Sequence, residues 1–317
     1  MPLPDPTEQE IVGWFDSLSN WGRWGPDDQR GTLNLITPDR RRHAAGLVQD
    51  GLTVSCAWPI SVKEDPDQVH APRHYMMAAG EGEPAPGSRG RSNSLDVWNI
   101  APHGLTITHL DAPSHTFWRS TPDAPRTMYN GHRADRVRTR EGATAGSIEL
   151  AGDGIVGRGV LLDLPRLRGV GWWPAGTAFH VDELEAAEQA QGVRAGEGDI
   201  LMIRTGFPKM RTVEGPKWPV AQAGPHPTCL AWFRERGIAV LACDTANDVQ
   251  PARYPGIGLP VHGIGMAAMG LWLMDNGNYE ELTEACARLG RWEFLVTLAV
   301  LKLQHGTGSP VNPIALL

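Results

Sequence analysis

The amino-acid sequence predicts an α/β fold with a mixed sheet, formed by residues 1–317 as a single domain. The first observation behind this prediction is that apolar strand-like runs alternate with helix-like segments through the second half of the chain. The second is that capping residues and glycines mark the ends of most of these segments. The third is that no internal repeat or low-complexity linker divides the chain, whose length suits one large domain.

The N-terminal region is expected to be ordered. Residues 1–36 carry Trp and Leu among turn-forming residues, which indicates an N-terminal arm rather than a disordered tail. The triplet 37–39, Thr-Pro-Asp, is a typical helix start, because Thr caps the helix, Pro suits its first turn and an acid favours its amino end. This helix is expected to run to about Asp50 and to stop at Gly51.

Three segments follow before the middle of the chain. Residues 52–62 have the β-branched and apolar character of a strand. Residues 63–93 are rich in Pro, Gly and charged residues, so we expect a long loop there that acts as a lid or as a dimer arm. Strand character returns over residues 94–111.

The second half is expected to supply most of the sheet. An Asp182–Glu185 capping box begins one helix, and Gly192 is expected to end it. The expected strands are Val160–Leu164, Asp199–Arg204, Ile238–Cys243, Leu271–Asp275 and Trp292–Leu303, and the expected helices cover 182–192, 228–236, the residues from His262 up to Gly270, and Tyr279–Leu289.

Residues 106–115, Thr-Ile-Thr-His-Leu-Asp-Ala-Pro-Ser-His, form the most informative stretch of the chain. In an extended segment the side chains of His109, Asp111 and His115 point to the same face. Imidazole nitrogens and a carboxylate presented together suit Zn²⁺ or Mn²⁺. The stretch therefore predicts a metal or catalytic site, and a surface strand with scattered polar side chains is the alternative.

A second group of polar residues follows the expected strand that ends at Cys243. Asp244 and Asp248 come directly after it, and His262 opens the next helix. A helix out and a strand back cover comparable distances, ~12 Å and ~15 Å, so Asp275 could finish near His262. An unbroken helix would place these two residues on different faces, and roles in a helix start and a turn are the alternative.

Four further residues are candidate substrate contacts. Arg204 and Thr205 at a strand end could hold a substrate carbonyl or carboxylate, or could pair with an acid. His226 lies between prolines and could line a pocket. The twelve tryptophans, Trp24 among them, indicate either core packing or an apolar pocket for an aromatic ligand.

Composition and charge exclude several classes of partner. The net charge of −7 argues against nucleic acid or an anionic membrane. No apolar run reaches the ~18 residues that a membrane span needs. The four cysteines are far apart, which favours free thiols in a reducing compartment, and the first residues lack the pattern of a signal peptide. We therefore expect a cytoplasmic protein that binds a small-molecule substrate.

The chain resembles the cyclase family of metal-dependent hydrolases, which includes bacterial kynurenine formamidases and isatin hydrolase. The family motif is H-x-G-T-H-x-D-x-P-x-H, and the later part of it matches Thr108, His109, Asp111, Pro113 and His115. The resemblance covers nearly the whole chain, and it extends to residues 20–25, 33–34, 204–206 and 306–313.

The resemblance implies roles for the candidate residues. His109 and Asp111 would be metal ligands and His115 the catalytic acid–base. His262 would bind the metal or act beside it, and Asp275 lies where formamidases have a glutamate ligand. The resemblance also implies one divalent metal, Zn or Mn, a swivelling β/β/α fold with a mixed, partly barrel-like sheet, and a homodimer or higher homo-oligomer.

Two departures from the family motif affect the expected metal site. The first His of the motif falls on Leu105 and its Gly on Ile107. His103 could substitute, but six extended residues span ~20 Å, so the chain would have to bend at Gly104. The motif is therefore compatible with a family member that binds a single metal or none. Asp instead of Glu at position 275 weakens the case for a centre with two metals.

Three functions are compatible with these residues. The leading hypothesis is metal-dependent hydrolysis of an amide, lactam or formamide C–N bond in a small cyclic or aromatic substrate, with His115 moving the proton. The first alternative is an acid–base cyclase or dehydratase (lyase) on the same scaffold. The second is a catalytically inactive protein that binds a small molecule.

Overall fold

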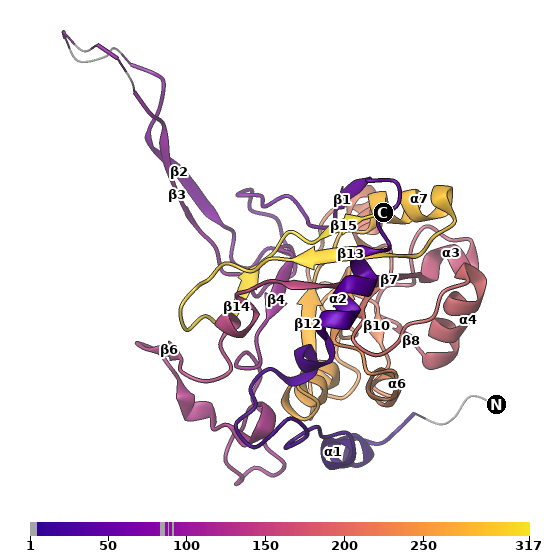
Figure 1. The fold of residues 1–317 in the computed structure, drawn as a ribbon. Coiled ribbons are helices and arrows are strands. Elements are labelled where there is room, and N and C mark those ends of the chain that lie inside the picture. Colours follow the sequence, from indigo (N-terminus) through magenta and orange to yellow (C-terminus); the bar gives the residue numbers. More distant parts are fainter. Residues whose placement is uncertain (1–4, 83–85, 88, 91) are drawn as a thin grey trace.

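A nine-stranded mixed sheet organises the fold (Figure 1). The computed structural model describes residues 5–82, 86–87, 89–90 and 92–317. The strands lie in the order β1-β15-β13-β7-β9-β11-β12-β4-β14, and the sheet curls into half a barrel. The predicted α/β fold with a mixed, partly barrel-like sheet is confirmed.

The sheet has a parallel centre and antiparallel flanks. β7, β9, β11 and β12 run parallel, whereas β13 and β4 pair antiparallel with the outer members of this group. The nine strands are β1 (Thr53–Ser55), β4 (His109–Asp111), β7 (Ile155–Asp163), β9 (Ile200–Arg204), β11 (Val240–Cys243), β12 (Trp272–Asp275), β13 (Glu293–Leu298), β14 (Gly308–Pro310) and β15 (Ile314–Leu316).

Helices cover both faces of the sheet and bury the central strands completely. One core cluster contains Leu282 of α7, and the opposite cluster contains side chains of α1, α4 and α6. Because both faces are covered, β9, β11 and β12 are continuous apolar runs rather than alternating ones. The helices are α1 (Glu8–Ser17), α2 (Pro38–Ala45), α3 (Leu164–Arg168), α4 (Val181–Gln191), α5 (Phe207–Glu214), α6 (Cys229–Arg236) and α7 (Glu280–Leu289).

Short elements connect these main ones. A six-residue π-helix, η5 (Val261–Met266), lies between β11 and β12. Within the described residues the body also contains four 3-10 helices, η1 (Gly31–Leu35), η2 (Tyr129–Gly131), η3 (Ala134–Arg136) and η4 (Ile148–Ala151). Two small ladders pair β5 (Val137–Arg138) with β6 (Gly142–Ala143) and β8 (Ala178–Phe179) with β10 (Gly224–Pro225).

A β-hairpin projects from the body of the molecule (Figure 1). It consists of β2 (Arg73–Ala78) and β3 (Leu95–Asn99), which pair antiparallel. The expected long loop over 63–93 is therefore wrong for residues 73–78. Their side chains are mostly exposed, so no burial pattern in the sequence marks them as a strand. Residues 83–85, 88 and 91 of the expected loop, like residues 1–4 of the N-terminal arm, lie outside the described residues.

Several predicted elements of the second half are confirmed. The strands predicted at 199–204, 238–243 and 271–275 are β9, β11 and β12. The predicted helices at 182–192, 228–236 and 279–289 are α4, α6 and α7. Gly192 and Gly237 adopt the left-handed conformation that ends a helix, as their positions predict.

The first half needs three corrections. The helix that begins at its cap Thr37 ends at Ala45 rather than Asp50, because the chain turns at Gly46. Strand pairing over 52–62 stops at Ser55, where the partner β15 runs out. The predicted strand 94–111 is split into β3 and β4, since Pro102 and Gly104 interrupt it.

Four boundaries of the second half also differ. The strand predicted at 160–164 begins at Ile155 and stops at Asp163, which caps α3. The helix α4 is capped by His180 with Glu183, two residues before the predicted capping box. The prediction missed this cap because His is not among the residues that usually cap helices. The strand predicted at 292–303 stops at Leu298, where its partner β7 begins. The helix predicted from His262 to Gly270 is the π-helix η5 followed by turns.

Candidate metal centre

Two neighbouring strands present three of the candidate residues. β4 pairs antiparallel with β12, and the register places Asp275 directly opposite His109. Asp111 lies on the same side of β4 as His109, two residues further along. His109 Nε2 is 3.4 Å from Asp111 Oδ1 and 4.0 Å from Asp275 Oδ2. The short strand β4 therefore presents an imidazole and a carboxylate beside the carboxylate at the end of β12.

His262 reaches this group from the π-helix η5. Its Nε2 lies 3.6 Å from Asp111 Oδ2 and 3.5 Å from Asp275 Oδ2. The expected approach of His262 and Asp275 is thus observed, although the element between them is not the long helix that was predicted. π-helices are rare in proteins, but those that occur are often found at functional sites. Their wider turn directs side chains differently from an α-helix.

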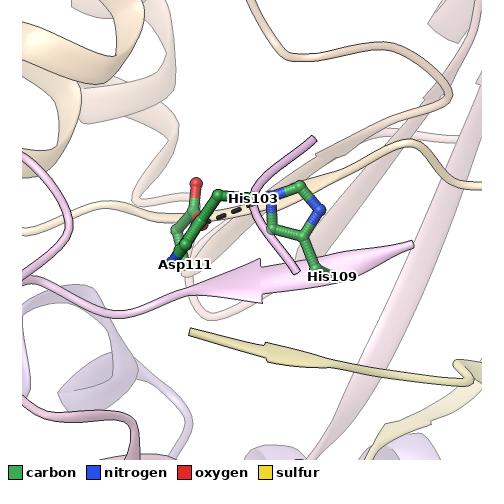
Figure 2. A group of neighbouring side chains, drawn as sticks. All are labelled: His103, His109 and Asp111. Atoms are coloured by element: carbon green, nitrogen blue, oxygen red, sulfur yellow. Dashed lines mark hydrogen bonds and ion pairs between the residues drawn. The ribbon is translucent and has the colours of Figure 1, made fainter. Parts of the chain in front are cut away.

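His103 also joins the group, because the chain bends over residues 103–107. Figure 2 shows the ring of His103 directed at the carboxylate of Asp111, with His109 beside them. His103 Nδ1 donates to Asp111 Oδ1 at 2.7 Å, and its Nε2 lies 3.0 Å from the Thr307 hydroxyl. The bend that the sequence required near Gly104 is therefore present.

His115 lies beyond the end of β4 rather than on it. The strand stops at Asp111, and a turn closed by the His115 N–H and the Ala112 carbonyl follows. His115 Nε2 is nevertheless 3.9 Å from Asp111 Oδ2, and its ring stacks on that of His103 at 3.9 Å between centroids. The predicted extended segment is wrong for 112–115, but the predicted convergence of the three side chains is observed.

Hydrogen bonds orient two of the imidazoles from behind. His109 Nδ1 donates to the Ile107 carbonyl at 2.8 Å, and His262 Nδ1 donates to Asp248 Oδ2 at 2.7 Å. Asp248 also accepts the backbone N–H groups of Val261 and His262, each at 3.0 Å. Both rings therefore direct Nε2 towards the carboxylates, which is how metal-ligating histidines are usually held.

The donor set fits a divalent cation. The candidate ligand atoms form two groups that share Asp111, and within each group they lie within 4.8 Å of one another: His103, His109 and Asp111 make up one, and Asp111, His262 and Asp275 the other. Ligands at about 2.0–2.1 Å from a tetrahedral zinc are about 3.3 Å from one another. Asp111 Oδ2 is completely buried and has no hydrogen-bond partner among the described residues. A buried carboxylate oxygen without a donor is costly unless a cation or solvent compensates it.

Comparisons with known proteins identify the family. Residues 51–247 match the family described as "Putative cyclase". A crystal structure of a novel cyclase is 32% identical to the chain, covers 96% of it and 99% of its own length, and superposes with a TM-score of 0.83. The chain belongs to the cyclase family. The search of curated proteins found no match.

More distant structures share the cyclase fold. Isatin hydrolase A from Labrenzia aggregata, bound to benzyl benzoate, is 20% identical, with 86% of this chain and 94% of that chain covered and a TM-score of 0.56. An isatin hydrolase bound to the product analogue thioisatinate is 17% identical, with coverages of 86% and 94% and a TM-score of 0.54. At these identities the likeness concerns the fold alone.

The centre of this cyclase-family protein is strongly polarised. Burial disfavours the charged form of His109, but Asp111 and Asp275 outweigh burial and raise its pKa to about 9. Burial likewise opposes charge on His262, and Asp275 with Asp111 nevertheless raises its pKa well above the usual value. Burial would raise the pKa of Asp111, but the neighbouring imidazoles, His109 foremost, hold it well below its ordinary range. The carboxylates thus attract positive charge, as protons or as a cation.

His115 differs from the other two imidazoles. Burial lowers its pKa to about 4, because the attraction of Asp111 does not compensate for desolvation and for the neighbouring histidines. Its side chain is 29% exposed, whereas that of His109 is 2% exposed. At neutral pH His115 is therefore an uncharged base that solvent can reach.

Opposite pH trends are expected for the metal-free and the zinc-loaded protein. Without metal, the favourable charge on His109 is fully present below pH 6.5 and is lost as the pH rises through about 9. A metal needs the neutral imidazole, so proton competition weakens over the same range. The Tm of chelator-treated protein should fall from pH 6.5 to pH 9, while the rise in Tm caused by zinc should grow. A zinc-induced rise in Tm that does not depend on pH would contradict the assignment of His109 as a metal ligand.

The four predicted substrate contacts interact with residues outside the centre. Arg204 forms ion pairs with Asp163 and Glu280. The hydroxyl of Thr205 donates to Asp244. Trp24 packs against the core below Arg23, and His226 bonds Thr228 and stacks on His180. Their role in substrate binding stays a prediction.

Sequence reasoning missed the residues that support the ligands. Asn247 Nδ2 donates to Asp275 Oδ1 at 2.5 Å, so that Oδ2 faces the histidines. Asn276 Nδ2 donates a hydrogen bond to the Gly104 carbonyl in the bend that carries His103, and the Thr307 hydroxyl is hydrogen-bonded to His103 Nε2. The one available signal was the position of Asn276 directly after a candidate ligand.

No helix in the described part of the chain is long and apolar enough to cross a membrane.

Proposed function

We propose that this cyclase-family protein is a metal-dependent hydrolase that cleaves an amide, lactam or formamide C–N bond of a small cyclic or aromatic substrate. The observation that carries the proposal is the convergence of His262 and Asp275 on Asp111, whose buried Oδ2 has no hydrogen-bond partner among the described residues, together with His109 at 3.4 Å from Asp111 Oδ1. The shared fold with isatin hydrolases supports a cyclic amide as substrate.

One divalent metal, zinc or manganese, suits these nitrogen and oxygen donors. Bound there, such a cation would lower the pKa of water and polarise a carbonyl group. His109 and His262 would hold it through Nε2, and Asp111 and Asp275 would hold it through carboxylate oxygens. His103, whose ligand atom lies within 4.8 Å of those of His109 and Asp111, would be a further ligand of that group, and without metal its ring nitrogens contact Asp111 and Thr307.

His115 is the proposed acid–base residue. It faces Asp111, is partly exposed and is neutral at pH 7, so it can take a proton from an attacking water. The resulting imidazolium would lie near the buried carboxylate and could return the proton to the leaving nitrogen. His103 stacks on the ring and restricts its orientation.

Metal analysis together with product analysis tests the proposed function. Protein purified without chelator should hold close to one zinc or manganese per chain, and His109→Ala should lose it, while His74→Ala on the projecting hairpin should keep it. The loaded enzyme should convert members of a panel of lactams, formamides and aromatic amides to products that have gained one water. Absence of metal after reconstitution would refute the proposal, and a product that gains no water would favour the acid–base lyase.

We also propose that the protein forms a homodimer through its projecting hairpin. Tyr75, Met77 and Trp98 on the hairpin are more than half exposed, and a two-stranded hairpin has little stability alone. A cavity of about 860 Å³ at its base is lined by Trp58, Ile60 and other apolar residues. In a two-fold symmetric dimer, each copy would cover the exposed hairpin and the cavity at its base in the other copy. Sedimentation should show a dimer that Trp98→Glu dissociates.

The cysteines support the proposed cytoplasmic location. Cys56, Cys229, Cys243 and Cys286 are all buried and unpaired, which confirms the predicted free thiols. Free thiols persist in a reducing compartment.

A further inference from the structure

Asn276 occupies an unusual position beside the candidate centre. It follows Asp275 at the end of β12 and adopts a left-handed conformation with φ 57°. Its side chain is almost completely buried. Asparagine tolerates this conformation better than most residues, because its short amide can bond nearby backbone.

The Asn276 side chain connects β12 to the bend that precedes β4. Its Nδ2 donates to the Gly104 carbonyl at 2.6 Å and to the Ile107 carbonyl at 3.1 Å. Its backbone carbonyl accepts the hydroxyl of Thr108 at 2.6 Å. One residue thus makes three hydrogen bonds to residues 104–108, a segment far from it in the sequence.

Two of these hydrogen bonds act on histidines of the centre. The Ile107 carbonyl that accepts the Asn276 amide also accepts Nδ1 of His109, and so defines the ring orientation that turns Nε2 towards the carboxylates. The Gly104 carbonyl lies in the bend that brings His103 onto Asp111. Releasing Asn276 therefore loosens both His109 and His103.

The amide acts here only as a hydrogen-bond donor. Asn276 Oδ1 is buried and has no hydrogen-bond partner among the described residues, whereas Nδ2 donates to the Gly104 and Ile107 carbonyls. An aspartate of the same shape would place a carboxylate against two carbonyl oxygens, and a glycine would keep the backbone conformation while removing the donors.

We propose that Asn276 is a positioning residue of the metal centre, which holds His109 and the His103 bend in the geometry that a divalent cation requires. The inference rests on the proposed metal centre. It predicts that loss of the Asn276 amide weakens metal binding although Asn276 supplies no ligand atom. Partners of this kind typically contribute 10- to 100-fold to metal affinity.

Asn130 provides a matched control outside the centre. It has the same left-handed conformation, φ 57°, and its Nδ2 donates to the carbonyls of Gly25, Pro26 and Asp28 at 2.9–3.1 Å. Asn130 Oδ1 also accepts the Gly22 N–H at 2.8 Å, so Asn130→Gly removes at least as many amide hydrogen bonds as Asn276→Gly, with the same change in backbone freedom. A purely structural role of such clamps would affect both variants in the same way.

The decisive experiment measures zinc affinity by competition with a chromogenic chelator for wild type, Asn276→Gly, Asn276→Asp and Asn130→Gly. The expected result is an affinity lower by about 10- to 100-fold in both Asn276 variants, with wild-type affinity in Asn130→Gly. Wild-type affinity in Asn276→Gly, or an equal loss in Asn130→Gly, would overturn the inference.

Hydrogen exchange of the metal-free proteins separates this inference from the proposed function. The amides of residues 104–109 should exchange faster in Asn276→Gly than in wild type or Asn130→Gly. If wild type binds no zinc, the proposed function fails, and exchange alone then decides whether Asn276 holds this segment. Unchanged exchange in Asn276→Gly would overturn the positioning role in either case.

Discussion

Replacing His115 by alanine is expected to lower turnover by about 10²- to 10⁴-fold while metal content stays at the wild-type level. The reason is that His115 is a neutral, partly exposed base at the edge of the centre, whereas the better buried His109 and His262 lie between the carboxylates. Steady-state kinetics and elemental analysis on the same preparations measure both quantities.

Ser114→Ala is the matched control for this prediction. Ser114 is the preceding residue, and no described group bonds its buried hydroxyl. The control variant should keep both turnover and metal. Full turnover in His115→Ala would exclude the proposed acid–base role, and loss of metal together with turnover would instead make His115 a ligand.

Replacing Asp111 by asparagine is expected to abolish stoichiometric metal binding, and turnover with it. Asp111 lies within 4 Å of the imidazoles of His103, His109, His115 and His262, and is the residue they share. The substitution removes the negative charge and replaces one carboxylate oxygen with an amide NH2 group, a hydrogen-bond donor that faces the imidazole nitrogens. Breaking a buried charge pair also costs about 3–5 kcal/mol of stability. Elemental analysis and urea unfolding measure the two effects.

Asp96→Asn tests whether this effect is specific to the buried centre. Asp96 pairs with His74 on the exposed hairpin, where an ion pair contributes about 0–1 kcal/mol. This variant should keep the metal and nearly all of its stability. If Asp111→Asn also kept one metal per chain, Asp111 could not be a ligand of the centre.

The local spacing of residues was sufficient to find most of the candidate centre. His109 and Asp111 are close in sequence, and the short strand β4 needed little else to present them together. His115 was found for an incorrect reason, since a turn rather than a strand brings it back. Local spacing predicts proximity even when the predicted element is too long.

His103 and the supporting residues depended on contacts that local patterns do not contain. Whether His103 joined the centre depended on a bend stabilised by Asn276, which lies in another part of the chain. The hairpin strand β2 was missed because its exposed side chains do not alternate with buried ones. The apolar strands β9, β11 and β12 were predictable, since burial on both faces imposes a continuous apolar run.

The pairing of β4 with β12 has a consequence for how the protein matures. These strands are neighbours in the sheet but come from opposite halves of the chain, and β7, β9 and β11 are formed between them in sequence. Contacts between distant parts of a chain form late in folding, because long loops must close first. The candidate ligands of β4 and β12 therefore come together only after β12 has been synthesised and has docked beside β4.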